Sequence, residues 1–190
     1  MRILCFGDSN TYGYDPRSYF GEPYSEPWPE IFSQKSGHQV FNAGQNGREI
    51  PHTSWQLQHF EAVLSCWGTF DRMTIMLGGN DLLQNHGFTA EDVGTRMESF
   101  LTYLLQRFAP SSLMLIAPVP MVKGAWVQEE YLLRESFRLC DVYSDLADRL
   151  GIPFADSRKW DVEKVFDGVH FSANGHRAFA NGLLKAFSDL

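Results

Sequence analysis

Ser9, Asp167 and His170 are the residue types of a nucleophile, an orienting acid and a base. Ser9 follows a short apolar run in the segment FGDSN, residues 6–10. A serine hydroxyl is a weak nucleophile until a base accepts its proton. Asp167 and His170 lie in the segment FDGVHF, residues 166–171, where the carboxylate can fold back onto the imidazole and fix its tautomer. Read alone, each segment also fits a plainer role, a turn-capping serine or a hydrogen-bonded structural histidine.

Two further segments offer hydrogen-bond donors for a developing negative charge. Gly44 lies in NAGQNG, residues 42–47, and Asn80 lies in LGGND, residues 77–81. A glycine lets a substrate approach the backbone, so the Gly44 N–H could stabilise an oxyanion, and the Asn80 amide could do the same. The alternatives are an ordinary turn at Gly44 and an asparagine that caps a helix at position 80.

The elements that must position these residues are visible as alternating apolar patterns. Apolar runs predict strands at residues 2–6, 39–42, 72–77, 113–117 and 152–155. Helical spacing predicts helices at residues 28–36, 52–67, 89–109, 129–150 and 173–187, with Thr89 and Asp92 capping the third. This order predicts a three-layer α/β/α sandwich with a five-stranded parallel sheet, in one domain spanning residues 1–190.

The candidate residues all follow predicted strands, namely the first, second, third and fifth. The carboxyl ends of parallel strands meet at one edge of a sheet, where ligands bind in such folds. The four segments should therefore converge and supply a nucleophile, a base, an acid and two oxyanion donors. These are the parts that acyl transfer needs.

Three long loops, residues 12–27, 118–128 and 157–172, should rise at the same edge, and long loops in compact domains are often functional. The first is rich in aromatic residues, and Trp126 lies on the second. We expect Asn10, Tyr12, Tyr14 and Trp126 to line the substrate site. The loop aromatics could instead form a subunit interface, which would make the protein a homo-oligomer, or pack locally. These aromatics are Tyr12, Tyr14, Tyr19, Phe20, Tyr24 and Trp28.

Charge and composition exclude several function classes. The 190 residues carry a formal net charge of -7, which disfavours nucleic acid or an anionic membrane as a partner. The three cysteines form no C-x-x-C pair, and the histidines other than His170 have no companions at metal-ligand spacing, so no metal site is expected. No apolar stretch is long enough for a membrane span or a signal peptide. We expect a cytoplasmic protein.

The motifs in order resemble those of the SGNH hydrolases, also called GDSL-type esterases and lipases. GDS at residues 7–9, NAG at 42–44, GGND at 78–81 and DGVH at 167–170 are similar to the four motifs of that family. The resemblance implies a flavodoxin-like fold, and an oxyanion hole formed by the Ser9 N–H, the Gly44 N–H and Asn80. It also implies that no metal or organic cofactor is needed. Asn10 stands where the family often has leucine, and the continuation to Gly13 is more similar to the bacterial arylesterase and acyltransferase branch.

We therefore expect a serine esterase that cleaves short- to medium-chain acyl esters of a small molecule, such as acetyl esters of sugars or aryl alcohols. An acyltransferase that uses an alcohol other than water is the nearest alternative. A non-catalytic carbohydrate-binding relative is another, although no triad member is missing. The nucleophile elbow of α/β-hydrolases, G-x-S-x-G, does not match, because Thr11 stands where it has its second glycine. Phosphate-binding glycine patterns are also absent from the sequence.

Overall fold

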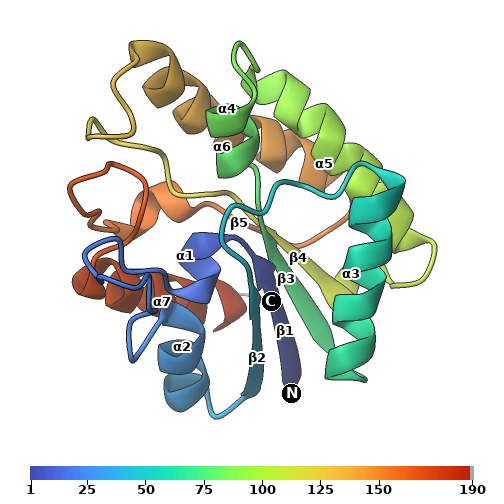
Figure 1. The fold of residues 1–190 in the computed structure, drawn as a ribbon. Coiled ribbons are helices and arrows are strands. Elements are labelled where there is room, and N and C mark those ends of the chain that lie inside the picture. Colours follow the sequence, from blue (N-terminus) through green and yellow to red (C-terminus); the bar gives the residue numbers. More distant parts are fainter. Residues whose placement is uncertain (189–190) are drawn as a thin grey trace.

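The computed structural model describes residues 1–188 and contains a central sheet of five parallel strands (Figure 1). Its strands lie in the order β2-β1-β3-β4-β5, the order of flavodoxin-like folds. The strands are β1 (Arg2–Gly7), β2 (Gln39–Gly44), β3 (Arg72–Met76), β4 (Leu113–Ile116) and β5 (Phe154–Ala155). The predicted α/β class and the parallel sheet are confirmed.

Helices cover both faces of this sheet (Figure 1). Five long ones are α2 (Trp28–Ser36), α3 (Ser54–Trp67), α5 (Ala90–Leu105), α6 (Glu130–Leu150) and α7 (Ala173–Ser188). Two short ones, α1 (Ser9–Tyr12) and α4 (Gly79–Gln84), begin just after β1 and β3, and two 3₁₀ turns are η1 (Pro110–Ser112) and η2 (Ser157–Trp160). The reciprocal cap of α5 by Thr89 and Asp92 is confirmed.

Alternate residues of β1 enter two separate hydrophobic cores. Leu4 and Phe6 pack with buried residues of α3, α5 and α6, while Ile3 and Cys5 pack with those of α2 and α7. This alternation is the period-2 pattern of a strand covered on both faces. The two cores hold the sheet rigid beneath the edge where its carboxyl ends meet.

Several predicted boundaries are corrected by the structure. Strand β5 spans only Phe154–Ala155, because it pairs with β4 alone over two residue pairs. Helix α5 ends at Leu105, four residues before the predicted end. The next N–H groups, of Gln106 and Arg107, donate to the carbonyls of Tyr103 and Leu104 and form a turn that ends the helix. Strand β2 continues to Gly44, which the prediction placed after the strand, since Gly44 still pairs with Gly7. Within residues 1–188, no helix is both long and apolar enough to cross a membrane.

Candidate active site

Ser9 is the first residue of the one-turn helix α1, directly beyond the carboxyl end of β1. Asp8 caps this helix: its side chain accepts a hydrogen bond from the Asn10 N–H at 2.9 Å. Gly13 ends it in a left-handed conformation with φ 93°. The turn leaves the Ser9 side chain 6% exposed, facing the carboxyl edge of the sheet. Because Ser9 is the first helical residue, its own N–H has no acceptor within the helix.

His170 joins Ser9 to Asp167 through two hydrogen bonds. Its Nε2 lies 3.0 Å from the Ser9 Oγ, and its Nδ1 lies 2.7 Å from Asp167 Oδ2. Asp167 is fully buried, and its other oxygen accepts the backbone N–H groups of Val169 at 2.8 Å and His170 at 3.0 Å. The three residues that the sequence singled out are thus brought together in the order acid, imidazole, hydroxyl.

The surroundings of Asp167 keep its carboxylate ionised. Burial by itself raises the pKa of this group, but hydrogen bonds from the His170 ring and from the His170 and Val169 N–H groups outweigh burial, so the pKa is lowered. An ionised carboxylate only accepts hydrogen bonds. His170 Nδ1 therefore carries the hydrogen that is donated to Asp167, and the lone pair of Nε2 faces the Ser9 hydroxyl.

Asn10 has a different role from the predicted one. Its side chain does not line the cavity beside Ser9 but bonds to the peptide groups on both sides of His170. The Nδ2 donates to the Val169 carbonyl at 3.2 Å, and the Oδ1 accepts the Phe171 N–H at 2.9 Å. Asn10, the residue after Ser9, thus fixes the backbone that carries His170. A leucine side chain at this position would have no atoms for these bonds.

The loop at residues 118–128 packs against the segment that carries Asp167 and His170. The Trp126 N–H donates to the Asp167 carbonyl at 3.0 Å, and the Val122 N–H donates to the Gly168 carbonyl at 3.0 Å. Lys164 adds a third link, since its Nζ donates to the carbonyls of Val119 at 3.3 Å and Val169 at 3.1 Å. Two of the three predicted long loops therefore form one hydrogen-bonded unit over the site.

A cavity of about 620 Å³ opens beside Ser9 and His170. The rings of Tyr14 and Trp126 flank the imidazole, with centroid distances of 4.8 Å and 5.2 Å. Both side chains line the cavity, as predicted, whereas Tyr12 does not. The backbone of Tyr12 instead packs against Gly44. The remaining lining residues are Asn46, Gly47, Asn80, Leu83, Gln84 and Val169.

Gly44 occupies a structural position rather than a place in the cavity. Its N–H donates to the Asn42 Oδ1 at 3.0 Å, and a Cβ added there would lie 2.1 Å from the Tyr12 nitrogen. A glycine is needed at position 44 so that α1 can pack on β2. This geometry argues against the predicted oxyanion role of Gly44, and the close approach of helix and strand is the reason.

Gly47, three residues later, is the glycine that lines the cavity, and the sequence reasoning missed it. Its backbone has φ 71°, and in residues 1–188 its N–H donates to no protein acceptor. The second glycine of the NAGQNG segment was the available signal. Gly47, rather than Gly44, is part of the lining of the cavity beside Ser9.

Asn80 lines the same cavity from the first turn of α4. Its Nδ2 donates to the Arg48 carbonyl at 3.0 Å, which orients the amide and leaves its second N–H for another acceptor. The adjacent Asp81 accepts the Ile50 N–H at 3.1 Å and pairs with Arg96 at 2.9 Å. These contacts bind the segment after β2 to α4 and set Gly47 and Asn80 side by side in the cavity wall.

Charged groups lie beneath the triad. Burial raises the pKa of Asp8 to about 6, against the opposing effects of the Asn10 N–H, His170, Lys164 and Arg48. Burial likewise lowers the pKa of Lys164 to about 8, partly offset by Asp8 and Asp167. Asp8 is thus close enough to His170, Lys164 and Arg48 to interact with all three electrostatically. In the described part of the chain, no cluster of three or more His, Cys, Asp or Glu side chains is placed to hold a metal ion.

Comparisons with known proteins agree with this architecture. A family model described as GDSL-like Lipase/Acylhydrolase matches residues 5–178. The solved structure of a carbohydrate acetylesterase family member from Sinorhizobium meliloti is 26% identical, with a TM-score of 0.83 over 99% of this chain and 97% of that one. The native aryl esterase of M. smegmatis is 25% identical, with a TM-score of 0.83 over 100% and 99%.

A more distant structure, a lipase/acylhydrolase from Enterococcus faecalis, shares the fold. It is 19% identical, with a TM-score of 0.74 over 99% of this chain and 95% of that one. A search of curated proteins found no match.

Proposed function

The chain belongs to the GDSL-like lipase/acylhydrolase family, and from this premise we propose that it hydrolyses short- to medium-chain acyl esters through an acyl-serine intermediate. The observation that carries the proposal is the unbroken hydrogen-bonded series from Asp167 through His170 to Ser9. Ser9, at the end of this series, borders a cavity of about 620 Å³, a size typical of small-molecule sites. Esterase chemistry as such follows from the family, and the mechanism and substrate below belong to the proposal.

In the first step, His170 Nε2 accepts the Ser9 hydroxyl proton as Oγ attacks the ester carbonyl. Asp167 remains ionised and stabilises the imidazolium that forms, and the nearby charge of Asp8 acts in the same direction. The carbonyl oxygen becomes an oxyanion. The imidazolium then donates its proton to the alcohol oxygen, the C–O bond breaks, and the acyl group stays on Ser9.

Three N–H groups are assigned to the oxyanion: those of Ser9, Gly47 and the Asn80 side chain. All three residues line one cavity, and the backbone donors of Ser9 and Gly47 are not used by other protein groups in residues 1–188. Donors held in place before the reaction stabilise the developing charge without reorganisation. Gly47 replaces Gly44 in this assignment because the Gly44 N–H is bonded to Asn42.

In the second step, water attacks the acyl-serine. His170 takes a proton from this water, the same donors hold the second oxyanion, and collapse releases the acid and restores the Ser9 hydroxyl. A small acyl group is favoured by the rings of Tyr14 and Trp126, which both pack close to His170 and line the cavity. The similar structures of an aryl esterase and a carbohydrate acetylesterase family member support acetyl esters of aryl alcohols or sugars.

The test is hydrolysis of p-nitrophenyl esters of increasing acyl length by the wild type and by Ser9→Ala. We expect the wild type to prefer acetate over butyrate and octanoate. Ser9→Ala should lose activity by about 10³-fold or more, since the activated nucleophile is gone. Circular dichroism would establish that the variant is folded. Equal rates in the two folded proteins would refute the serine mechanism, and a preference for octanoate would refute the short-acyl assignment.

A further inference from the structure

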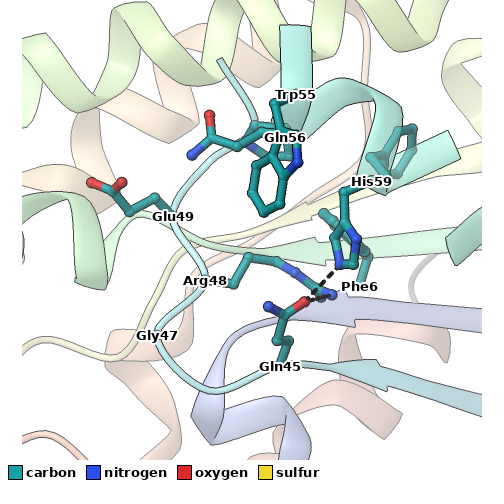
Figure 2. Close-up of a pocket in the computed structure, with 10 residues that line it drawn as sticks. Phe6, Gln45, Gly47, Arg48, Glu49, Trp55, Gln56 and His59 are labelled. Atoms are coloured by element: carbon teal, nitrogen blue, oxygen red, sulfur yellow. Dashed lines mark hydrogen bonds between the residues drawn. The ribbon is translucent and has the colours of Figure 1, made fainter. Parts of the chain in front are cut away.

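A second cavity, of about 140 Å³, also has Gly47 in its lining (Figure 2). It is bounded by the segment at residues 45–49, by the first turns of α3 and by Phe6. Figure 2 shows Gln45 and Arg48 extending from the segment toward Trp55 and His59, which project from α3. Gly47 lines both cavities, so the segment is the wall that they share.

The wall between the two cavities has open space around Gly47. A Cβ added at this position would meet only the Gln84 Nε2, at 4.0 Å. At position 47 the wall between the two cavities therefore carries backbone atoms alone. Because Gly47 lines both cavities, a ligand that spans them would place its ester against Ser9 and its alcohol part in the second cavity.

Trp55 gives the second cavity an aromatic face. Its side chain is 72% exposed, although burial would remove a large apolar area from water. It is stacked on His59, one helical turn later, with a centroid distance of 5.9 Å and an interplanar angle of 9°. His59 lies against one face of the indole ring, and most of Trp55 remains exposed for contact with a ligand.

Two amide side chains that line this cavity, Gln45 and Gln56, have N–H groups without a protein acceptor in residues 1–188. Gln45 Oε1 accepts from Arg48 Nη2 at 2.9 Å and lies 3.1 Å from His59 Nε2, so the Gln45 oxygen is engaged. Gln56 Oε1 accepts the N–H groups of His52 and Thr53. Neither amide donates through its Nε2 to another group of residues 1–188, so both Nε2 groups remain for an incoming oxygen.

An aromatic face beside amide donors matches the surface of a sugar ring. The C–H groups of a pyranose pack on an indole face, and its hydroxyl and ring oxygens accept hydrogen bonds from amides. A plain aryl group would cover the same face but would remove these donors from water without giving them acceptors, which is unfavourable. The second cavity, with its volume of about 140 Å³, suits one sugar ring rather than a chain of several sugars.

We propose that Trp55, with the amides of Gln45 and Gln56, forms a binding subsite for the sugar ring of an acylated monosaccharide. The inference rests on the proposed ester hydrolysis at Ser9 and names the substrate class of that site. Trp55 would act on binding and orientation of the ester, because it touches neither Ser9 nor His170.

The experiment compares two esters of the same acid, 6-O-acetylglucose and phenyl acetate. The readout is the ratio of kcat/KM for the sugar ester to that for phenyl acetate. In Trp55→Ala we expect this ratio to fall about threefold to tenfold, mainly through KM, which is the range of one aromatic contact. Trp55→Phe should retain most of the ratio. Phe137→Ala removes another exposed aromatic side chain, on α6, and serves as the matched control.

An unchanged ratio in Trp55→Ala would overturn the sugar subsite while leaving esterase activity at Ser9 intact. A rise in the ratio, caused by a selective loss on phenyl acetate, would overturn it in favour of an aryl site.

If the wild type hydrolyses neither ester, the proposed function fails, and the sugar subsite is then tested separately by a binding measurement. Calorimetric titration of 6-O-acetylglucose into Ser9→Ala and Ser9→Ala/Trp55→Ala should then show a Kd about threefold to tenfold higher without Trp55. Equal values of Kd, or no binding to either protein, would refute the subsite.

Discussion

At the scale of single residues, the site depends on which N–H groups are already used. Gly44 and Gly47 lie three positions apart in one segment, yet the first donates to Asn42 and the second faces the cavity. Nothing in the residue types distinguishes them, because the distinction comes from the packing of α1 on β2. The Asn80 amide is likewise placed by a single bond to the Arg48 carbonyl.

The side chain of Asn80 allows the oxyanion assignment to be tested directly. Asn80→Ala removes one of three donors, and kcat should fall by about 10²- to 10³-fold with little change in KM. Asn80→Asp should be no better than alanine, since a carboxylate places negative charge beside the oxyanion. Steady-state kinetics with p-nitrophenyl acetate measures both effects. Wild-type turnover in Asn80→Ala would remove Asn80 from the mechanism.

At the scale of elements, Asn10 connects the short helix α1 to the segment that carries the base. Its two hydrogen bonds cross 159 and 161 positions of the sequence and enclose His170 between them. A one-turn helix has little stability of its own, because a single turn lies within the unfavourable nucleation step of helix formation. We call these two Asn10 hydrogen bonds the clamp. The clamp stabilises helix α1 as well as the position of His170.

Substitution of Asn10 should lower kcat, which depends on the positioning of His170, without changing KM, which reflects substrate binding. In Asn10→Leu we expect kcat to fall about 10- to 100-fold with KM nearly unchanged, because the Ser9–His170 distance is no longer held. Loss of the two bonds should also lower the free energy of unfolding by about 1–3 kcal/mol. Kinetics and urea unfolding measure the two effects. The conservative Asn10→Gln tests whether the polar atoms alone suffice, and an Asn10→Leu enzyme with normal kcat would contradict the positioning role.

The same scale shows what the sequence could and could not predict. The long helices follow from apolar periodicity, which is strong over ten or more residues. The parallel sheet follows from the alternation of strands and helices, but its strand order does not, and only the family resemblance implied a flavodoxin-like arrangement. Helices α1 and α4, of four and six residues, are too short to show a period, so only their capping positions, Asp8 and Gly78, could signal them. The triad was predictable because its residue types carry the chemistry. The clamp and Gly47 were not, since both depend on contacts between distant segments.

At the scale of the whole molecule, the active site lowers the stability of the fold. Asp8 is 5% exposed, and its pKa is raised from 3.8 to about 6, mainly by burial. The folded state thus holds a proton that the unfolded chain releases between these pH values. The stability associated with protonated Asp8 is full below about pH 4 and is lost as pH rises through about 6. Near neutral pH the protein keeps a buried carboxylate beneath its triad at a cost in stability.

Asp8→Asn should reveal this cost. The amide does not titrate, and it retains an oxygen that can accept the Asn10 N–H. Relative to the wild type, its free energy of unfolding should rise by about 2 kcal/mol more at pH 7.5 than at pH 4.5. Esterase activity should fall, because a charge near His170 is removed. Urea unfolding at the two pH values measures the difference. Asp15→Asn is the control, since hydrogen bonds from Arg17 lower the pKa of that carboxyl, and it should show no such gain.

The bond between Ser9 and His170 joins positions 161 residues apart, and this separation ties catalysis to the end of folding. A chain synthesised only as far as β5 contains the nucleophile but no base. Even the full chain lacks a working site until the segment before α7 has docked on α1, a contact whose loop-closure entropy is among the largest that the fold must overcome. Ester hydrolysis is therefore a built-in reporter of complete folding. During refolding, activity should return no earlier than the slowest contact between the two halves of the chain.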